Sequence, residues 1–428
     1  MKQRLLVFSA DAMVYEDLAY LKTLPNYKRY LEGGAEIKTL KSIYPTVTFP
    51  VHESIVTGAY PDRHGIASNY ELHPGVLQLP WHWFHKAAKE KDIFDIAKEN
   101  GFSTAAVGWP VTGNHPSIMH LIADYHTQYP GETLKEAFTR AGSGEGELKI
   151  IEKNTFGIEK LDHPECDETI INNSCDIIRQ YKPEVLFIHV ANIDDYRHKN
   201  GIFNEKVARG VEETDVWIGR LMAALEDAGV ADETNFFLIS DHGQIDIKRI
   251  VNINALLADY GLIQKDDSGK LIGWDAYSLS NGLSSLIYLR DPSDLKLNEK
   301  THALLRYLCE EGVYGIGKVY TESEARKNER LGGDFSFVLE TDGYTAFGDD
   351  WKRPLVKTFD FTDYRYGRAT HGSLPDKGPQ PMLIARGRGI REATLERRNI
   401  VDLAPTFAKL LNLEFPGTDG ICINEILK

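Results

Sequence analysis

The chain is poor in the features that mark disulfide-stapled, secreted or membrane-spanning proteins. It has four cysteines in 428 residues, none in a CxxC pair, which fits neither a disulfide framework nor a cysteine-based metal module. Buried reduced thiols are the simplest interpretation. No apolar run approaches the roughly 20 residues that span a bilayer, and the first apolar run is too short for a signal-peptide core. We therefore expect a cytoplasmic protein.

The chain is also short of positive charge. Its 49 lysines and arginines face 63 acidic residues, giving a formal net charge of −14. Nucleic-acid polymers and anionic membranes bind basic surfaces, so neither is expected as a partner. A small anionic substrate remains compatible, because bound metal ions can reverse the local charge. The sequence leaves homo-oligomerisation open.

The hydrophobic content of 42% is ordinary for a globular protein with a real core. Apolar strand patterns alternate with helical patterns over residues 1–251 and again over 366–428, which predicts one catalytic α/β domain. Between residues 252 and 365 this alternation weakens and Gly and Asp punctuate the chain. We predict that this segment is an inserted cap or substrate subdomain.

The stretch Tyr44–Asn69 reads YPTVTFPVHESIVTGAYPDRHGIASN. Thr48 stands just ahead of a proline that can open a helix. A helix N-terminus presents free N–H groups and partial positive charge, so a nucleophile placed there can receive a phosphoryl group.

Acids and histidines follow several of the predicted strands. Asp11 ends the apolar run at 4–10, although a turn or helix-capping role is the alternative. Asp194 and His198, four residues apart, follow the run at 184–190. Ligands of α/β sheets lie at the carboxyl ends of the strands, so these side chains are site candidates.

Two further motifs complete this pattern. Asp241 and His242 follow the strand NFFLIS and precede a glycine, and His371 lies in a Gly- and Pro-rich loop. Each motif alone is weak. Together with Thr48 they supply seven oxygen and nitrogen ligands, enough for two adjacent metal sites that leave positions open for substrate.

Aromatic residues gather after the Thr48 stretch. Trp81, Trp83 and Phe84 lie in LPWHWFHK, and Trp109 lies in GWP. With Phe49 they are candidates for a platform that binds a flat substrate group. Ordinary packing is the alternative.

The segment TFPVHESIVTGAYPDRHGI resembles the nucleophile motif of the type I phosphodiesterase/nucleotide pyrophosphatase family of the alkaline phosphatase superfamily. DxxxH, SDHG and the late THG follow in the superfamily's chain order, and the resemblance runs from Leu5 to the helix APTFAKLLNL. It implies an alkaline-phosphatase-like α/β/α sandwich around a mostly parallel sheet. It also implies two bound Zn²⁺, for which Mn²⁺ or Fe are alternatives given the three Asp and three His ligands.

The resemblance assigns roles residue by residue. Thr48 becomes both nucleophile and metal ligand, and Asn69 donates to a phosphate oxygen. One metal would be held by Thr48 with Asp11, Asp241 and His242, and the other by Asp194, His198 and His371. A metal lowers the pKa of the Thr48 hydroxyl, and attack on phosphorus gives a covalent phosphothreonine.

The WHWF and GWP segments resemble the nucleotide phosphodiesterase branch, which favours a small phosphorylated substrate cleaved at a phosphodiester or pyrophosphate bond. A phosphonoacetate-hydrolase-like C–P hydrolase is an alternative, but the lysines expected at about 107–116 are missing from VGWPVTGNHP. A phosphomonoesterase of the same superfamily is another. A non-catalytic binding protein would have lost a ligand or the nucleophile, and all of them are present.

Overall fold

The computed structural model describes residues 3–155 and 163–428. Its main sheet has eight strands in the order β19-β2-β18-β6-β1-β5-β3-β4. Their bounds are β1 Arg4–Ala10, β2 Ala35–Lys41, β3 Thr104–Val107, β4 His120–Ile122, β5 Val185–Val190, β6 Thr234–Ile239, β18 Leu383–Arg386 and β19 Ala393–Asn399. Only β18 runs antiparallel to its neighbours. The predicted mostly parallel sheet is confirmed.

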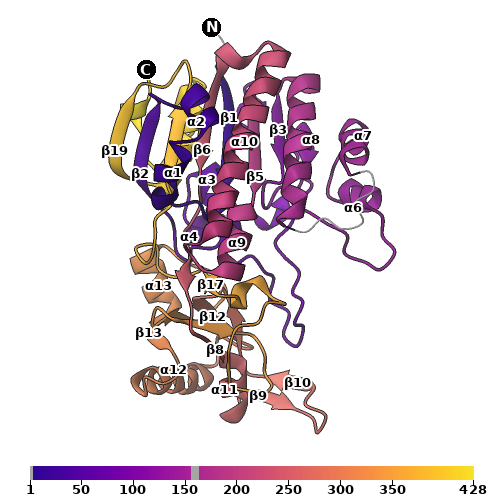
Figure 1. Ribbon diagram of the computed structural model, residues 1–428. Helices are drawn as coiled ribbons and strands as arrows, with labels where there is room; N and C mark the ends of the chain where they lie inside the picture. The colour runs from indigo at the N-terminus through magenta and orange to yellow at the C-terminus, as the bar shows by residue number, and fades with distance from the viewer. Residues whose placement is uncertain (1–2, 156–162) are drawn as a thin grey trace.

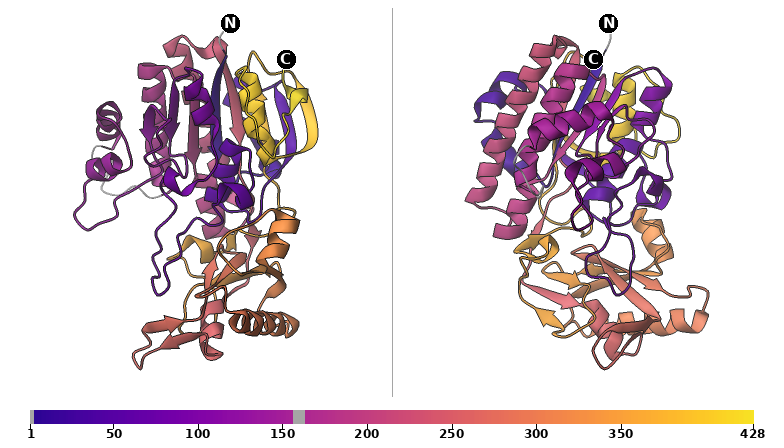
Figure 2. Two further views of the ribbon diagram at one scale, coloured as in Figure 1. Left: turned by 180° about the vertical axis from the view of Figure 1, so that it is seen from behind. Right: turned by 90° about the vertical axis from the view of Figure 1, so that its right-hand side faces the viewer.

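Helices cover both faces of this sheet. Side chains alternate along a strand, so Leu5 and Val7 of β1 join one core while Leu6 and Phe8 join the other. The first core includes α3 (Thr48–Thr57), α5 (Ile93–Glu99) and α14 (Leu403–Leu410). The second includes α1 (Leu18–Leu21), α2 (Pro25–Tyr30), α8 (Glu165–Tyr181) and α10 (Glu205–Ala228). Figure 1 shows α8 and α10 in front of the sheet, and Figure 2 shows yellow α14 on the opposite face.

The long helix α10 begins and ends where the sequence indicates. The Asn204 side chain accepts hydrogen bonds from the N–H groups of Lys206 and Val207, which caps the helix start. Gly229, with φ of 71°, adopts the left-handed conformation that closes the helix. The cap at Asn204 and the glycine at 229 thus set the two ends of the helix.

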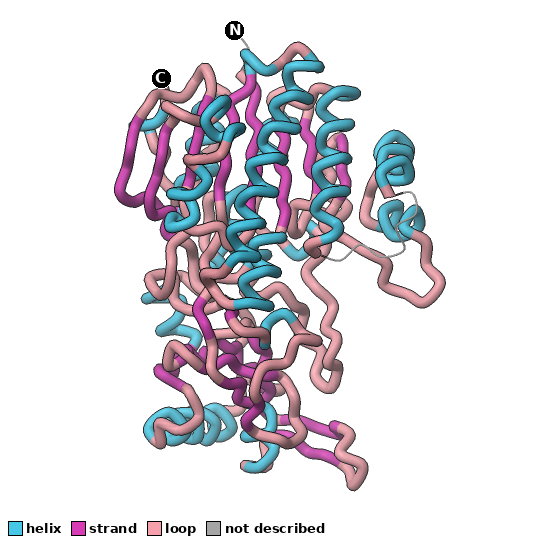
Figure 3. Tube along the Cα trace, in the orientation of Figure 1, coloured by secondary structure: helices cyan, strands magenta, loops and turns pink. Residues whose placement is uncertain are grey.

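A second group of strands lies beyond the carboxyl ends of the main sheet, in the lower half of Figures 1 and 3. An antiparallel sheet has the order β11-β12-β14-β13, a three-stranded sheet β15-β8-β16, and a hairpin β9-β10. The strand bounds are β8 Arg249–Asn252, β9 Ile263–Lys265, β10 Leu271–Trp274, β11 Ala276–Ser280, β12 Ser284–Leu289, β13 Ile316–Thr321, β14 Phe337–Thr341, β15 Thr345–Gly348 and β16 Val356–Lys357. With α11 (Ile253–Asp259), α12 (Leu295–Glu310) and α13 (Glu322–Glu329), these strands surround separate apolar clusters. The boundaries at 252 and 365 and the role in substrate binding stay predictions.

The remaining α-helices and strands are short. They are α4 Pro61–His64, α6 Leu134–Arg140, α7 Glu145–Asn154, α9 Asn192–Asn200, β7 Ile245–Asp246 and β17 Ala369–Thr370. Within the described ranges, the helices are all too short or too polar to cross a bilayer. All four cysteines are unpaired thiols; Cys166 and Cys175 are buried, whereas Cys309 and Cys422 are only partly so.

Candidate metal centre and active site

Thr48 is the first residue of α3. Val47 before it is extended, with φ of −130° and ψ of 137°, so the chain enters the helix at the threonine. The Thr48 hydroxyl oxygen lies 3.3 Å from Asp11 Oδ2 and 3.2 Å from His242 Nε2. The predicted nucleophile therefore stands at a helix N-terminus against two of the predicted ligands.

Asp11, Asp241 and His242 meet because β1 and β6 are neighbouring parallel strands that end together. His242 Nε2 lies 3.5 Å from Asp11 Oδ1 and 3.2 Å from Asp241 Oδ2. The other oxygen of Asp241 accepts the N–H of Ala12 at 3.2 Å. These three side chains form the first ligand group.

Asp194, His198 and His371 form the second group. Asp194 and His198 lie one turn apart on α9, directly after β5, with His198 Nε2 at 3.1 Å from Asp194 Oδ2. His371 Nε2 lies 3.9 Å from Asp194 Oδ1. Nδ1–H of His198 donates to the Ala369 carbonyl, and that of His371 donates to the Thr46 carbonyl. These bonds leave each Nε2 lone pair free to bind a metal.

The inserted region helps to position His371. The His371 carbonyl accepts the N–H of Leu283 at 2.9 Å. Gly372 has φ of 99°, and a Cβ there would lie 1.8 Å from the Asn281 carbonyl oxygen. Only glycine fits this close approach, so the turn that carries His371 is fixed against the β11–β12 connection.

The two groups adjoin. Asp194 lies within reach of both, since its carboxylate also approaches Asp11 and His242. The rings of His242 and His371 stack with centroids 4.0 Å apart. All seven predicted ligands thus occupy one continuous cluster at the carboxyl edge of the sheet.

The cluster fits bound cations and is poorly satisfied without them. Five of its buried atoms lack a hydrogen-bond partner in the described part of the chain: Asp11 Oδ1, Asp241 Oδ2, His198 Nε2, His242 Nδ1 and His371 Nε2. Each such atom costs about 1–3 kcal/mol of stability. Burial, followed by the charges of Asp241 and Asp194, raises the pKa of Asp11 well above its ordinary value. Carboxylates packed this closely ionise together only beside positive charge.

Two of the three histidines, His242 and His371, are held as neutral ligands. Burial lowers the pKa of His242 to about 4. Burial and the neighbouring His242 ring together lower the pKa of His371 well below its ordinary value. For His198 burial acts in the same direction, but the Asp194 charge prevails and raises the pKa. A metal replaces the proton at such a nitrogen. Three carboxylates and three imidazoles are a donor set that Zn²⁺, Mn²⁺ or Fe would fit, which makes the cluster a candidate metal site without selecting the metal.

Asn69 is oriented by its neighbours. Its Oδ1 accepts the N–H of Phe49 at 2.9 Å, so Nδ2 is the free donor end. One hydrogen of Nδ2 points to the Tyr364 hydroxyl at 3.2 Å, and that hydroxyl also accepts from Tyr70 at 2.7 Å. The second hydrogen is left for a molecule in the adjoining cavity.

Several supporting residues were not predicted from the sequence. Gln244 Nε2 donates to Asp194 Oδ1 at 2.5 Å, and His189 Nε2 lies 3.1 Å from Asp11 Oδ2. His52 Nδ1 donates to the Thr48 carbonyl at 2.8 Å. His189 carried a usable signal, because a histidine near the carboxyl end of an apolar strand points at the site edge. Tyr364 had no such signal, since it comes from a short 3-10 helix far along the chain.

A cavity of about 280 Å³ opens beside Thr48 and Asn69. Phe49, Trp81 and Trp83 line it as predicted, and the two tryptophans stack at 5.2 Å. Phe84 and Trp109 do not line it. Phe84 packs on Tyr125, and Trp109 is fully buried with its ring edge against His52. For these two residues, ordinary packing is what the structure shows.

The chain was compared with known families and proteins. The family model "Type I phosphodiesterase / nucleotide pyrophosphatase" matches residues 5–371. Ectonucleotide pyrophosphatase/phosphodiesterase family member 1 of Rattus norvegicus is 28% identical over 269 residues, which cover 59% of this chain and 26% of the relative. The chain thus matches about a quarter of the length of that relative.

Solved structures share the fold. Murine ectonucleotide pyrophosphatase/phosphodiesterase 5 superposes with a TM-score of 0.67 at 19% identity over the whole of both chains. An inactive threonine-to-alanine form of the murine protein, in complex with AMP, superposes with a TM-score of 0.68 at 18% identity, again over the whole of both chains.

Proposed function

This chain belongs to the type I phosphodiesterase/nucleotide pyrophosphatase family of hydrolases, and on that premise we propose that it cleaves phosphodiester or pyrophosphate bonds of small nucleotide-type substrates with Thr48 as nucleophile. One observation carries the proposal. The Thr48 hydroxyl lies at a helix N-terminus, 3.3 Å from Asp11 and 3.2 Å from His242, inside a cluster of unsatisfied metal-type donors.

The residues around Thr48 would hold two divalent cations. Asp11, Asp241 and His242 with Thr48 would hold one, and Asp194, His198 and His371 the other. When bound, such ions stabilise the attacking and leaving oxygens and lower the pKa of the hydroxyl. Zn²⁺ is our first choice.

The reaction divides into two displacements. The Thr48 oxygen attacks phosphorus, a Thr48 O–P bond forms, and the bond from phosphorus to the leaving oxygen breaks. Asp11 Oδ2, 3.3 Å from the hydroxyl oxygen, accepts the hydroxyl proton and returns it to the Thr48 oxygen in the second step. Thr48 is then a phosphothreonine that still carries the rest of a diester substrate. Water attacks phosphorus from the side vacated by the leaving group and restores the hydroxyl.

The neighbouring groups bind the phosphate during both steps. The free Nδ2 hydrogen of Asn69 reaches a non-bridging oxygen, and Tyr364 holds the amide in that orientation. The N-terminus of α3 adds partial positive charge beside the same oxygens. No residue of this set has to move far to do so, because the hydrogen bonds already fix them.

The aromatic wall favours a substrate with a flat group. Phe49, Trp81 and Trp83 offer ring faces and edges to the cavity that holds Thr48. The murine structural relative was solved in complex with AMP, which supports a nucleotide as the substrate class of this chain.

A substrate panel at equal metal loading tests the proposal. We expect hydrolysis of bis-p-nitrophenyl phosphate and thymidine 5′-p-nitrophenyl phosphate to exceed that of p-nitrophenyl phosphate and phosphonoacetate. A preference for the monoester over both diesters, or for the phosphonate, would contradict the proposed bond specificity.

A further inference from the structure

A second set of potential ligands lies on the wall of the same cavity. His163 and Cys166 line the cavity together with Thr48, and Asp167 lies behind them. His163 Nδ1 is 2.7 Å from Asp167 Oδ1 and 3.3 Å from Cys166 Sγ. Cys166 and Asp167 lie in the first turn of α8, which begins at Glu165, and His163 precedes the capping residue Pro164, so the chain entering the helix places its ring against both side chains.

Hydrogen bonding alone does not satisfy this cluster. A single Nδ1 faces both the thiol and the carboxylate; if it carries the proton for Asp167 it has no lone pair for the Cys166 S–H. Asp167 Oδ1 also accepts the Ala191 N–H at 3.2 Å. Asp167 Oδ2 is fully buried and lacks a hydrogen-bond partner within residues 3–155 and 163–428.

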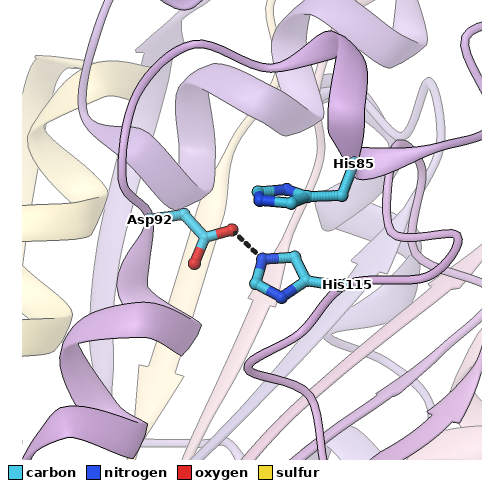
Figure 4. A group of neighbouring side chains, drawn as sticks. All are labelled: His85, Asp92 and His115. Atoms are coloured by element: carbon cyan, nitrogen blue, oxygen red, sulfur yellow. Dashed lines mark hydrogen bonds and ion pairs between the residues drawn. The ribbon is translucent and has the colours of Figure 1, made fainter.

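The cluster of His85, Asp92 and His115 shows how a satisfied histidine–aspartate pair differs (Figure 4). His115 Nε2 donates to Asp92 Oδ2 at 2.7 Å, and His115 Nδ1 accepts the Ser117 N–H at 3.0 Å. Asp92 Oδ1 caps α5. Both ring nitrogens of His115 are used, so this cluster has no spare imidazole lone pair from His115 for a metal.

We propose that His163, Cys166 and Asp167 form a third metal site, which binds a divalent transition metal of the Zn²⁺ class. Sulfur, nitrogen and oxygen donors in this number suit Zn²⁺, with three protein ligands and one open position. The open position faces the cavity and would take water or an oxygen or nitrogen atom of a bound molecule. Binding releases the thiol proton and gives Asp167 Oδ2 the partner it lacks.

This proposal does not rest on the hydrolytic activity. The ligands near Thr48 are all oxygen or nitrogen, so the new site is the one candidate cluster of the described residues that contains sulfur. Cobalt bound there must show thiolate-to-cobalt charge-transfer absorption in the near ultraviolet, whereas cobalt near Thr48 shows none. The spectrum therefore reports on this site separately.

The experiment loads the full metal-free chain with Co²⁺ and measures the absorption band and the metal per chain. We expect the charge-transfer band, and one equivalent of Co²⁺ per chain beyond the two that the sites beside Thr48 would bind. Cys166→Ser should lose both the band and that equivalent. Cys175→Ser is the matched control, because Cys175 is buried on the same helix with its thiol bonded to the Arg220 carbonyl; it should keep both.

Absence of the band while the other sites fill with cobalt would overturn the proposal, as would an unchanged band in Cys166→Ser. If Cys166→Ser fails to fold by circular dichroism, Asp167→Asn provides the second test. It keeps the thiol and the side-chain volume, and we expect at least a tenfold weaker Co²⁺ titration of the band. Unchanged cobalt affinity in Asp167→Asn would also count against the site.

Discussion

The cluster around Thr48 and the cluster of His85, Asp92 and His115 both contain histidines beside aspartates, next to helices α3 and α5 of the same layer. The two clusters differ in the hydrogen bonds that their histidine nitrogens make. In the cluster around Thr48, the Nε2 atoms of His198 and His371 are buried and have no hydrogen-bond partner in the described structure. In the cluster of Figure 4, both nitrogens of His115 are already bonded. The same residue types thus form a candidate metal centre in one place and a hydrogen-bonded pair, the structural brace, in the other. What differs is the bonding of the imidazole nitrogens next to the aspartate, not the residue composition; in the Figure 4 cluster, His85 Nδ1 is the buried ring nitrogen without a partner among the described residues.

The largest effect is expected at the nucleophile. Thr48→Ala removes the attacking oxygen, and loss of such a group costs on the order of 10³–10⁶ in kcat. Metal per chain should stay at the wild-type value, because six other ligands remain. Steady-state kinetics and metal analysis check both points, with Thr48→Ser, which keeps a hydroxyl, as the control. Near-native turnover in Thr48→Ala would remove Thr48 from the mechanism.

Measurements of bound metal are expected to distinguish the cluster around Thr48 from the cluster of Figure 4. Chelation should abolish hydrolysis and lower the free energy of unfolding by about 3 kcal/mol, the value for a ligand present at roughly a hundredfold excess over its Kd. Added Zn²⁺ or Mn²⁺ should restore both. His371→Ala should lower the metal content, whereas His85→Ala should leave it unchanged. Equal metal loss in the two variants would erase the distinction drawn above.

The hydrogen-bonded pair of His115 and Asp92 should contribute to the free energy of unfolding. His115→Ala deletes a fully used imidazole and leaves Asp92 Oδ2 buried without its partner, which we expect to cost about 2–4 kcal/mol. Denaturant unfolding measures this cost. The metal content and kcat of the folded fraction should match the wild type. A loss of bound metal in this variant would show that the cluster is a ligand site after all.

A smaller effect is expected at Tyr364. Tyr364→Phe removes the hydroxyl that orients Asn69 Nδ2, a hydrogen bond of about 1 kcal/mol, so kcat/KM should fall roughly fivefold. Metal content should not change. Tyr70→Phe, which removes a donor to Tyr364 without touching Asn69, is the comparison and should have the weaker effect. If Tyr364→Phe is indistinguishable from wild type, the orientation of Asn69 has another cause.

Much of the candidate metal centre could be predicted because the sheet topology brings its residues together. Asp11 and Asp241 directly follow apolar strands, and β5, β1 and β6 are adjacent and parallel. Side chains at their carboxyl ends must meet whatever the loops do. Thr48 could be placed as well, since the proline after it marks a helix start.

The rest depends on contacts that no local pattern encodes. Tyr364 reaches Asn69 from a position 295 residues away. Trp109 was expected in the cavity, but Gly108, with φ of 69°, turns the chain so that the indole packs against Phe187. The sequence GWP alone does not show whether the Trp109 side chain enters the cavity or packs in the core. The spare lone pairs of the His163 cluster, likewise, appear only once the helix start and Ala191 are placed beside it.

The central claim is that Thr48 is transiently bonded to phosphorus, and the stereochemical course of hydrolysis tests it most directly. A phosphorothioate diester that is chiral at phosphorus is hydrolysed in isotopically labelled water, and the configuration of the product is determined. Two successive in-line displacements invert phosphorus twice, so we predict net retention. Net inversion would mean that water attacks the substrate directly, and it would contradict a threonine nucleophile.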